Sequence, residues 1–558
     1  MKFSNRKILL ISLFAVFLFL RLFVDSPYIL LAADSLKFLD LAKHFPHHTL
    51  SNNQLYLLHA PFYPYVIHFV NLLISEDYLA AIAINLVAAC ITFFVLYKFF
   101  MLLTNNFPIA FTALLFFTLS VDLVIASHKV TRESFVIMLL ASAIYFYAKG
   151  VKLNNKKSII ASSIFGGILG VTTDHVIFLF PAFAVSYIFF NNKKISFKKL
   201  DFPNLKYAIL PVAVTLLLYA SWLGIRAYQY SAHEYYPSGL EGAPLKTKGF
   251  GLIELINPLY FEDFEPNDST KGDFVSRLKN YAFTLGYIFN IEPFSIPRGL
   301  NFATMKFLLF PRHVAYMFII YLPIAIVAAY GFLLIFRDFI NARKIHCNAS
   351  LYVISLLLIF IFPITQRATS QRYIYPAYIF FFYVLAYGTV ALSRKIGIFK
   401  KNTKMLAIAI AVMILLLVPI WHYSNSHFVF SLGKAVSAQN TGDFINKNIK
   451  STAAIMAQPG YTYKLVYMTD NRVISMPPKA QDLLPFIEYY NISYVVFGRY
   501  YTVDKYHYNS DSAELIKNSP GKFKLVSAIK EDYTKYVNPK DPASTDDVYI
   551  YEVISADN

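Results

Sequence analysis

The amino-acid sequence predicts an α-helical polytopic membrane protein with a small C-terminal α/β domain outside the membrane. Of the 558 residues, 57% are hydrophobic and 17% aromatic, and the mean hydropathy is +0.47. A soluble globule of this length cannot bury so much apolar surface. Apolar runs of about 17 to 22 residues recur up to position 421. Beyond that point the composition becomes mixed, as is typical of a water-soluble domain.

The apolar runs are predicted to be transmembrane helices. Each can cross a hydrocarbon core of about 30 Å, and in lipid every backbone polar group needs a partner within its own segment. The runs lack the period-two alternation of barrel strands. We therefore expect about eleven spans. Their approximate ranges are 8–24, 78–103, 107–126, 134–149, 158–173, 175–191, 207–225, 314–336, 351–365, 373–392 and 405–421.

The basic residues indicate the orientation of these spans. The net charge is +18, and Lys and Arg concentrate in short connections between spans. Basic loops stay in the cytoplasm, so the pattern predicts a cytoplasmic N-terminus and a multi-pass protein of the plasma (inner) membrane. It also argues against nucleic-acid binding. The four clusters are Lys149, Lys152, Lys156 and Lys157; Lys193, Lys194, Lys198 and Lys199; Arg337, Arg343 and Lys344; and Arg394, Lys395, Lys400 and Lys401.

The first apolar run is expected to be an uncleaved anchor. It is long, no Ala-x-Ala cleavage site follows it, and the later loop charges alternate correctly only if this helix is retained. Cys90 lies in a span and Cys347 in a cytoplasmic loop, so no disulfide is expected between them.

Two domains are predicted. Residues 1–425 form the membrane domain, with long extracytoplasmic segments at 25–77 and 226–313. The first of these segments is rich in apolar residues, and we expect short helices there that lie along the membrane surface. Residues 436–558 form the extracytoplasmic α/β domain. Its expected strands are 453–456, 494–497, 524–528 and 548–553, and its expected helices are 441–448 and 483–490.

Two acidic residues at the extracytoplasmic ends of helices are candidate catalytic residues. Asp34 follows the first span, and Glu133 precedes the fourth. A carboxylate held at the bilayer surface can act as a general base on a lipid-borne substrate. The structural alternatives are a solvated acid for Asp34 and, for Glu133, a favourable charge in a first helical turn capped by Thr131.

Cationic side chains on the same face are candidate phosphate ligands. Arg372 lies at the extracytoplasmic end of the tenth span and Arg226 at that of the seventh, and His59 precedes a Pro-rich stretch. A guanidinium can hold a phosphate through paired hydrogen bonds. The alternative is interfacial snorkelling beside aromatic residues.

Evidence for a cofactor in the sequence is weak. The turn Asp174-His175 could contribute to a metal site, but two adjacent residues are poor support, and a polar turn explains them equally well. No P-loop, dinucleotide fingerprint or nucleophile elbow is present. The sequence identifies no cofactor with certainty and leaves a divalent cation open.

Five short motifs, in this order, resemble those of the GT-C superfamily of integral-membrane glycosyltransferases. That superfamily includes the protein O-mannosyltransferases and the aminoarabinose transferases of lipid A. The motifs are Ala33-Asp34-Ser35 with Leu39-Asp40-Leu41-Ala42; His59-Ala60-Pro61-Phe62-Tyr63-Pro64; Thr131-Arg132-Glu133-Ser134; Ser221-Trp222-Leu223-Gly224-Ile225-Arg226; and Ser370-Gln371-Arg372-Tyr373-Ile374-Tyr375-Pro376.

The resemblance implies an inverting transfer of a sugar from a polyprenyl phosphate to an acceptor hydroxyl of a lipid, glycan or protein. Asp34 would then be the base, with Glu133 as the second acid. The implied substrate-binding residues are His59, Arg226, Arg372 and Tyr373.

Two other functions compete with this interpretation. A transporter or flippase of a lipid-linked sugar would place ionisable residues near the bilayer midplane. Here the acids gather at one face instead. A purely structural membrane partner would leave the grouped acids and arginines unexplained.

Overall fold

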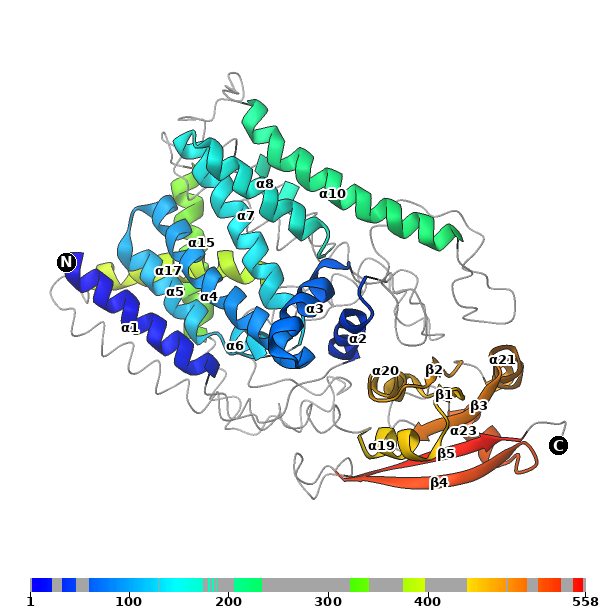
Figure 1. Ribbon diagram of the computed structural model, residues 1–558. Helices are drawn as coiled ribbons and strands as arrows, with labels where there is room; N and C mark the ends of the chain where they lie inside the picture. The colour runs from blue at the N-terminus through cyan, green and yellow to red at the C-terminus, as the bar shows by residue number, and fades with distance from the viewer. Residues whose placement is uncertain are drawn as a thin grey trace.

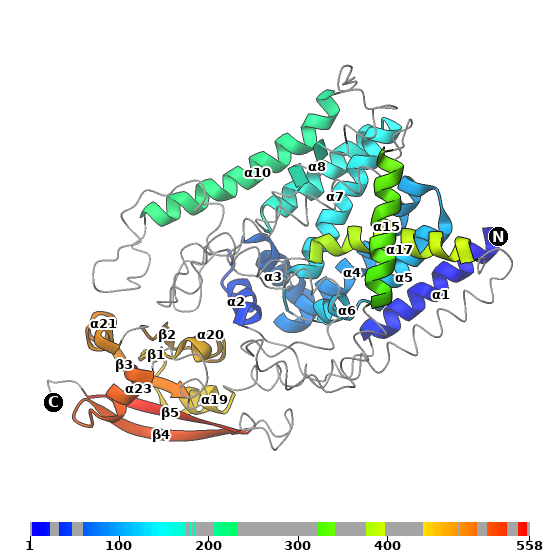
Figure 2. The same cartoon turned by 180° about the vertical axis from the view of Figure 1, so that it is seen from behind.

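The protein is mostly helical, with one five-stranded sheet (Figure 1). The computed structural model describes residues 3–22, 33–46, 60–128, 130–173, 205–232, 322–340, 375–396, 439–477, 480–498, 510–532 and 545–554, and positions 179, 180, 183, 184 and 187. The helices form a bundle, and the sheet with its own helices lies beside one end of that bundle (Figures 1 and 2).

The bundle is built around a nearly continuous apolar core. Its helix α7 is buried along most of its length, whereas α4 leaves Val87, Ile91 and Phe94 exposed on one side. An exposed apolar stripe on a long helix suits contact with lipid tails. The described bundle helices are α1 (Phe3–Leu22), α4 (Asp77–Thr104), α5 (Phe107–Leu119), α6 (Val121–His128), α7 (Glu133–Leu153), α8 (Lys156–Gly170), α10 (Leu205–Ala232), α15 (Leu322–Ile340) and α17 (Tyr375–Ile396).

Two of the described helices, α4 and α7, are long and apolar enough to cross a membrane, judged by length and composition alone. Most other predicted spans overlap helices of the bundle, but the predicted spans 175–191, 351–365 and 405–421 lie outside the described residues, apart from isolated positions in the first. The predicted single span 107–126 is wrong in one respect. Ser120 adopts an extended conformation and separates α5 from α6, so the backbone changes direction there.

Helices α15 and α17 approach each other closely at two glycines. A Cβ atom added to Gly331 would collide with the carbonyl oxygen of Val384, and one added to Gly388 with that of Val327. The crossing therefore depends on residues without side chains, which is a common way for membrane helices to pack backbone against backbone.

The segment 25–77 contains two short helices, as predicted. These are α2 (Ala33–Lys43) and α3 (Phe62–Ile74), and they pack on each other. The ring of Phe38 meets that of Tyr63 edge to face at 5.2 Å between centroids. At the end of α2, the ring of Phe45 contacts Tyr65, His68 and Phe69 of α3. Aromatic contacts therefore fix α2 against the start of α3.

The C-terminal part is a three-layer α/β unit. Its sheet has the order β2-β1-β3-β5-β4, in which the first three strands are parallel and the last two pairings are antiparallel. The strands are β1 (Ala454–Ala457), β2 (Arg472–Ser475), β3 (Ile492–Gly498), β4 (Phe523–Asp532) and β5 (Thr545–Val553). Two apolar clusters pack on opposite sheet faces, one under α19 (Gln439–Asn448) and α20 (Pro459–Met468), the other under α21 (Leu483–Tyr490) and α23 (Ser510–Lys517).

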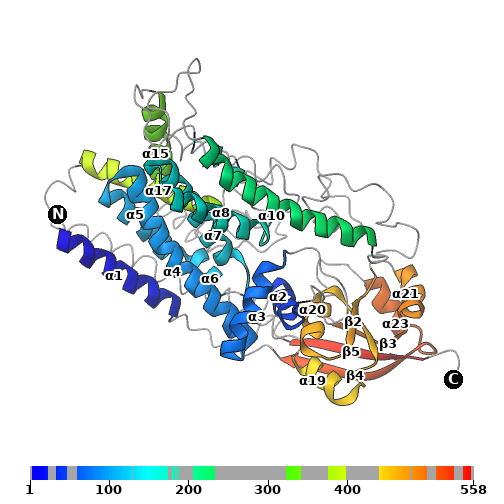
Figure 3. The same cartoon turned by 45° about the horizontal axis from the view of Figure 1, so that its top comes forward.

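The α/β unit contacts the membrane domain through α20, which packs against α2. The two helices lie side by side in all three views of the molecule (Figures 1, 2 and 3). Helix α2 is therefore held on one side by α3 of the bundle and on another by α20 of the C-terminal unit.

Candidate functional site

Asp34 lies in the first turn of α2, where the backbone alone is described. Its position is one helical turn before Phe38, and residues four apart lie on the same side of a helix. Phe38 contacts Tyr63 at the start of α3. The candidate base is thus placed at the end of the bundle where α3 begins.

Tyr63 also belongs to a cluster of polar residues, which we call the Tyr63–Glu133 cluster. It consists of Tyr63 on α3, Asn85 on α4, Arg132, and Glu133 at the first position of α7. Tyr63 and Asn85 have no exposed surface, and Glu133 is half-buried. Among the described residues, neither the Tyr63 hydroxyl nor Glu133 Oε2 makes a well-aligned hydrogen bond, although solvent reaches neither atom. The Asn85 side chain is a polar neighbour of the hydroxyl.

Backbone contacts fix the frame of this cluster. The Asn85 side-chain amide donates to the carbonyl oxygen of Thr131 at 2.8 Å, and Arg132 Nη1 donates to that of Thr172 at 3.1 Å. The Phe62 amide donates to the carbonyl oxygen of Val171 at 3.2 Å. The start of α3, the start of α7 and the end of α8 are therefore joined at one place.

The predicted capping role of Thr131 is wrong. Helix α7 begins at Glu133 with Arg132 in the cap position, and no side chain accepts a hydrogen bond from its first amides. Thr131 instead contributes its carbonyl oxygen to Asn85. An acid in the first turn remains favourable because the amide end of a helix carries partial positive charge.

The electrostatic environment of Tyr63 reflects its enclosure. Burial raises the pKa of the phenol, hydrogen bonding from the Asn85 side chain toward the phenol oxygen opposes this shift, and the nearby Glu133 carboxylate raises the pKa further. The hydroxyl therefore stays protonated at physiological pH and is available as a hydrogen-bond donor.

Arg21, which sequence reasoning missed, is a buried cation at the end of α1. Its Nη1 and Nη2 donate to the carbonyl oxygens of Thr118 and Phe117, at 3.3 and 3.5 Å, and its guanidinium stacks 3.8 Å from the Phe17 ring centroid. The carbonyl oxygen of Arg21 in turn contacts His128 Nε2. The last carbonyl oxygens of α5 have no amide donor within the helix, and Arg21 supplies donors to two of them. Arg21 therefore stabilises the break between α5 and α6.

The remaining predicted site residues are only partly visible. His59, Arg372 and Tyr373 lie outside the described residues, as do Asp174 and His175. Arg226 is placed in α10 by its backbone only. Within the described part of the chain, no three His, Cys, Asp or Glu side chains group together as metal ligands would.

Tyr63 and Asn85 also escaped sequence reasoning. A Tyr in a Pro-rich stretch and an Asn in an apolar helix have no distinctive pattern of their own. The one available signal is that Asn85 is a polar residue within a long apolar run, and polar residues in membrane spans are costly and usually functional or paired.

The cluster has hydrogen-bonding capacity that its described neighbours leave unused. It offers a protonated phenol that can donate and a carboxylate oxygen that can accept, both enclosed by protein. Interactions with such groups are stronger here than in water because the local dielectric constant is low.

A family model and solved structures match this chain. Residues 58–224 match the family described as dolichyl-phosphate-mannose-protein mannosyltransferase, a range that contains the Tyr63–Glu133 cluster. No curated protein sequence matches the chain significantly. The oligosaccharyltransferase AglB from Archaeoglobus fulgidus, solved with an inhibitory peptide and a dolichol-phosphate, aligns with a TM-score of 0.57 at 10% identity, covering 98% of this chain and 76% of AglB.

ArnT from Cupriavidus metallidurans also aligns with this chain. The TM-score is 0.44 for the apo structure and 0.43 for the complex with undecaprenyl phosphate, each at 13% identity and 98% coverage of both chains. The family match and the fold shared with AglB confirm the predicted resemblance to the GT-C superfamily of membrane glycosyltransferases.

Proposed function

We propose that this chain, with its likeness to GT-C glycosyltransferases, transfers a sugar from a polyprenyl phosphate to an acceptor hydroxyl. One observation carries the proposal. Glu133 Oε2 and the Tyr63 hydroxyl are enclosed and make no well-aligned hydrogen bond with the described residues. Tyr63 also contacts Phe38 of α2, the helix whose first turn contains Asp34. Buried polar atoms in folded proteins normally have partners. Two such atoms in one place therefore favour a site completed by a polar substrate.

In the proposed reaction, Asp34 accepts the proton of the acceptor hydroxyl. The hydroxyl oxygen attacks the anomeric carbon of the sugar, the bond from that carbon to the phosphate oxygen breaks, and polyprenyl phosphate leaves with the bonding electron pair. Attack opposite the leaving group inverts the anomeric configuration. General-base assistance of this kind contributes about 10²- to 10⁴-fold to the rate.

The other candidate residues divide into two roles. Arg372, Arg226 and His59 stabilise the departing phosphate, with Tyr373 beside them. Glu133 orients a hydroxyl of the substrate, and Tyr63 donates a hydrogen bond to the same group. If a divalent cation were bound, the Asp34 and Glu133 carboxylates would hold it, and it would supply positive charge to the departing phosphate.

The membrane arrangement that suits this reaction is the predicted one. It has about eleven spans, a cytoplasmic N-terminus and the C-terminal domain outside. The donor's lipid tail then remains in the bilayer while its phosphate reaches the face where α2 and α3 lie. With the opposite orientation, the residues of the site would face the cytoplasm, away from a donor sugar on the extracytoplasmic side.

The partners follow from the same chemistry. AglB, whose fold is shared, was solved with a dolichol-phosphate and a peptide. We propose a polyprenyl-phosphate-linked sugar as donor and a lipid, glycan or protein hydroxyl as acceptor.

The test uses the full-length chain in lipid nanodiscs. A panel of labelled polyprenyl-phosphate sugars is supplied with membrane extract as the acceptor source, and Asp34→Asn is the matched inactive variant. Labelled product is expected with the wild-type chain, and loss of product by at least about 100-fold with Asp34→Asn at unchanged expression. Movement of the labelled donor between leaflets in proteoliposomes, without product, would favour a flippase. Near-normal turnover of Asp34→Asn would refute the assignment of the base.

A further inference from the structure

The charged side of helix α2 is buried, which is unusual for a short helix outside the membrane core. Lys37 retains 7% of its exposed surface and Asp40 1%. Charged side chains are almost never this enclosed unless other groups compensate them. Both residues have interaction partners, as enclosed charges require.

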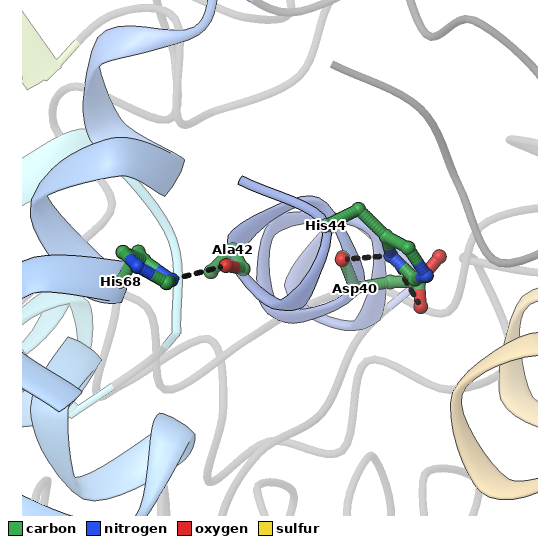
Figure 4. A network of polar contacts seen from close by, with 4 residues as sticks. All are labelled: Asp40, Ala42, His44 and His68. Atoms are coloured by element: carbon green, nitrogen blue, oxygen red, sulfur yellow. Dashed lines mark hydrogen bonds and ion pairs between the residues drawn. The ribbon is translucent and has the colours of Figure 1, made fainter. Parts of the chain in front are cut away.

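The residues of α2 divide between two neighbours. Ala42 offers its carbonyl oxygen to His68 Nδ1 of α3 at 2.9 Å, and Phe38 contacts Tyr63. Asp40 and His44 lie on the opposite side of α2 from His68, toward the ribbon of the C-terminal unit (Figure 4). His44 Nδ1 is 2.8 Å from the Asp40 carbonyl oxygen and 3.8 Å from Asp40 Oδ1. The charged side of α2 is thus the side turned away from α3.

Helix α20 supplies the opposing surface. Tyr461 and Leu465 of α20 pack into the apolar cluster on the sheet. Lys464 nevertheless retains only 7% of its exposed surface, and its Nζ lies 5.4 Å from the Tyr461 ring centroid. A helix that covers one sheet face of an isolated domain would leave such a lysine in water. Helix α20 packs on α2, and Lys464 is a buried cation of that helix.

We infer that α20 holds α2 in its working position through this buried charged contact, so that Asp40 and Lys464 are positioning residues for the acid at position 34. The inference rests on the proposed function for the role of Asp34. The mechanical part, that the C-terminal unit stabilises α2, stands on the packing alone. Asp40 lies in the same short helix as Asp34, within two helical turns of it, so a displacement of α2 at Asp40 also moves position 34.

Hydrogen exchange of the full-length chain in nanodiscs tests this coupling. Lys464→Met removes the charge and keeps an unbranched side chain. It should raise amide exchange in residues 33–43 about tenfold or more if, as we infer, the Lys464 charge stabilises the buried charged side of α2. Asp40→Asn should raise exchange in residues 459–468 reciprocally. Lys447→Met and Asp443→Asn, exposed residues of α19, serve as matched controls and should change neither segment.

Two outcomes would overturn the inference. The first is unchanged exchange of α2 in Lys464→Met and of α20 in Asp40→Asn. Exchange in peptides from β1 and β3 reports whether the C-terminal unit remains folded. If Lys464→Met unfolds that unit, the exchange of α20 in Asp40→Asn decides whether the two helices stabilise each other. The second is faster exchange of α2 in these variants with normal turnover. If α2 positions Asp34, kcat should fall while KM for the donor stays within about twofold.

The conservative variant Lys464→Arg should restore both protection and kcat. Failure of the proposed function would look different. In that case the wild-type chain would show no sugar transfer, while the reciprocal exchange effects between α2 and α20 would persist.

Discussion

Removal of one oxygen atom from Tyr63 should have opposite effects on stability and activity. The hydroxyl is buried beside the Asn85 side chain but makes no well-aligned hydrogen bond with the described residues. A buried, unsatisfied hydroxyl costs about 1–3 kcal/mol. Tyr63→Phe removes this cost and keeps the ring contacts with Phe38 and Phe135, so the free energy of unfolding should stay constant or rise by up to about 2 kcal/mol.

The effect on activity follows from the same geometry. A hydrogen bond from the phenol to a charged or polarised substrate group is worth about 1.5–3 kcal/mol. At about 1.4 kcal/mol for each factor of ten, transfer should slow about 10- to 100-fold. Initial rates with a labelled polyprenyl-phosphate sugar and thermal unfolding in the same detergent measure the two quantities side by side.

Tyr65→Phe is the matched control on the same helix. The Tyr65 hydroxyl donates to the carbonyl oxygen of Pro46 at 3.2 Å. Its removal should cost about 0.5–1.5 kcal/mol of stability and leave the transfer rate unchanged. The reasoning is refuted if Tyr63→Phe destabilises the protein while turnover remains normal, because the hydroxyl would then serve the fold rather than the substrate.

Three further predictions concern residues around the site and the bundle. Glu133→Gln keeps the shape of the side chain but removes its charge, and kcat should fall about 100-fold in the transfer assay with little change in thermal unfolding. Arg21→Met leaves the Phe117 and Thr118 carbonyl oxygens without their donor and should lower stability by about 1–3 kcal/mol; an unchanged melting temperature would contradict the capping role. Gly331→Val places a branched side chain against the Val384 backbone and should cost at least about 1–3 kcal/mol, whereas Gly224→Ala, with open space around it, should be tolerated.

Elements with strong local signals were predictable from the sequence. The helix predicted at 483–490 coincides with α21, and the strand predicted at 548–553 falls within β5. The sequence analysis missed β2 and α20. Strand β2 has only four residues, and α20 begins with Pro459-Gly460, a pair that usually marks a turn. Here the proline occupies the first turn of the helix, where its missing amide is not needed.

The candidate site was predictable only in part, for a physical reason. Glu133 stands out because an acid at the edge of an apolar run requires an explanation. Tyr63 is an aromatic residue among aromatic residues, and its role depends on Glu133, which lies far along the chain. Arg21 resembles any cation that ends a transmembrane run, and only the tertiary structure shows that carbonyls of another helix surround it.

Helix α2 shows most clearly why local pattern cannot decide such cases. Its sequence mixes Lys37 and Asp40 with apolar residues, which is typical of a helix with one side in water. In the structure both sides are covered, because α3 follows it closely in the chain while α20 comes from the far C-terminal end. The charges on α2 therefore belong to a domain contact that no short sequence window can contain. The helix that contains the proposed base contacts both α3 and α20, so we expect substitutions on its charged side to change the transfer rate as well as the packing.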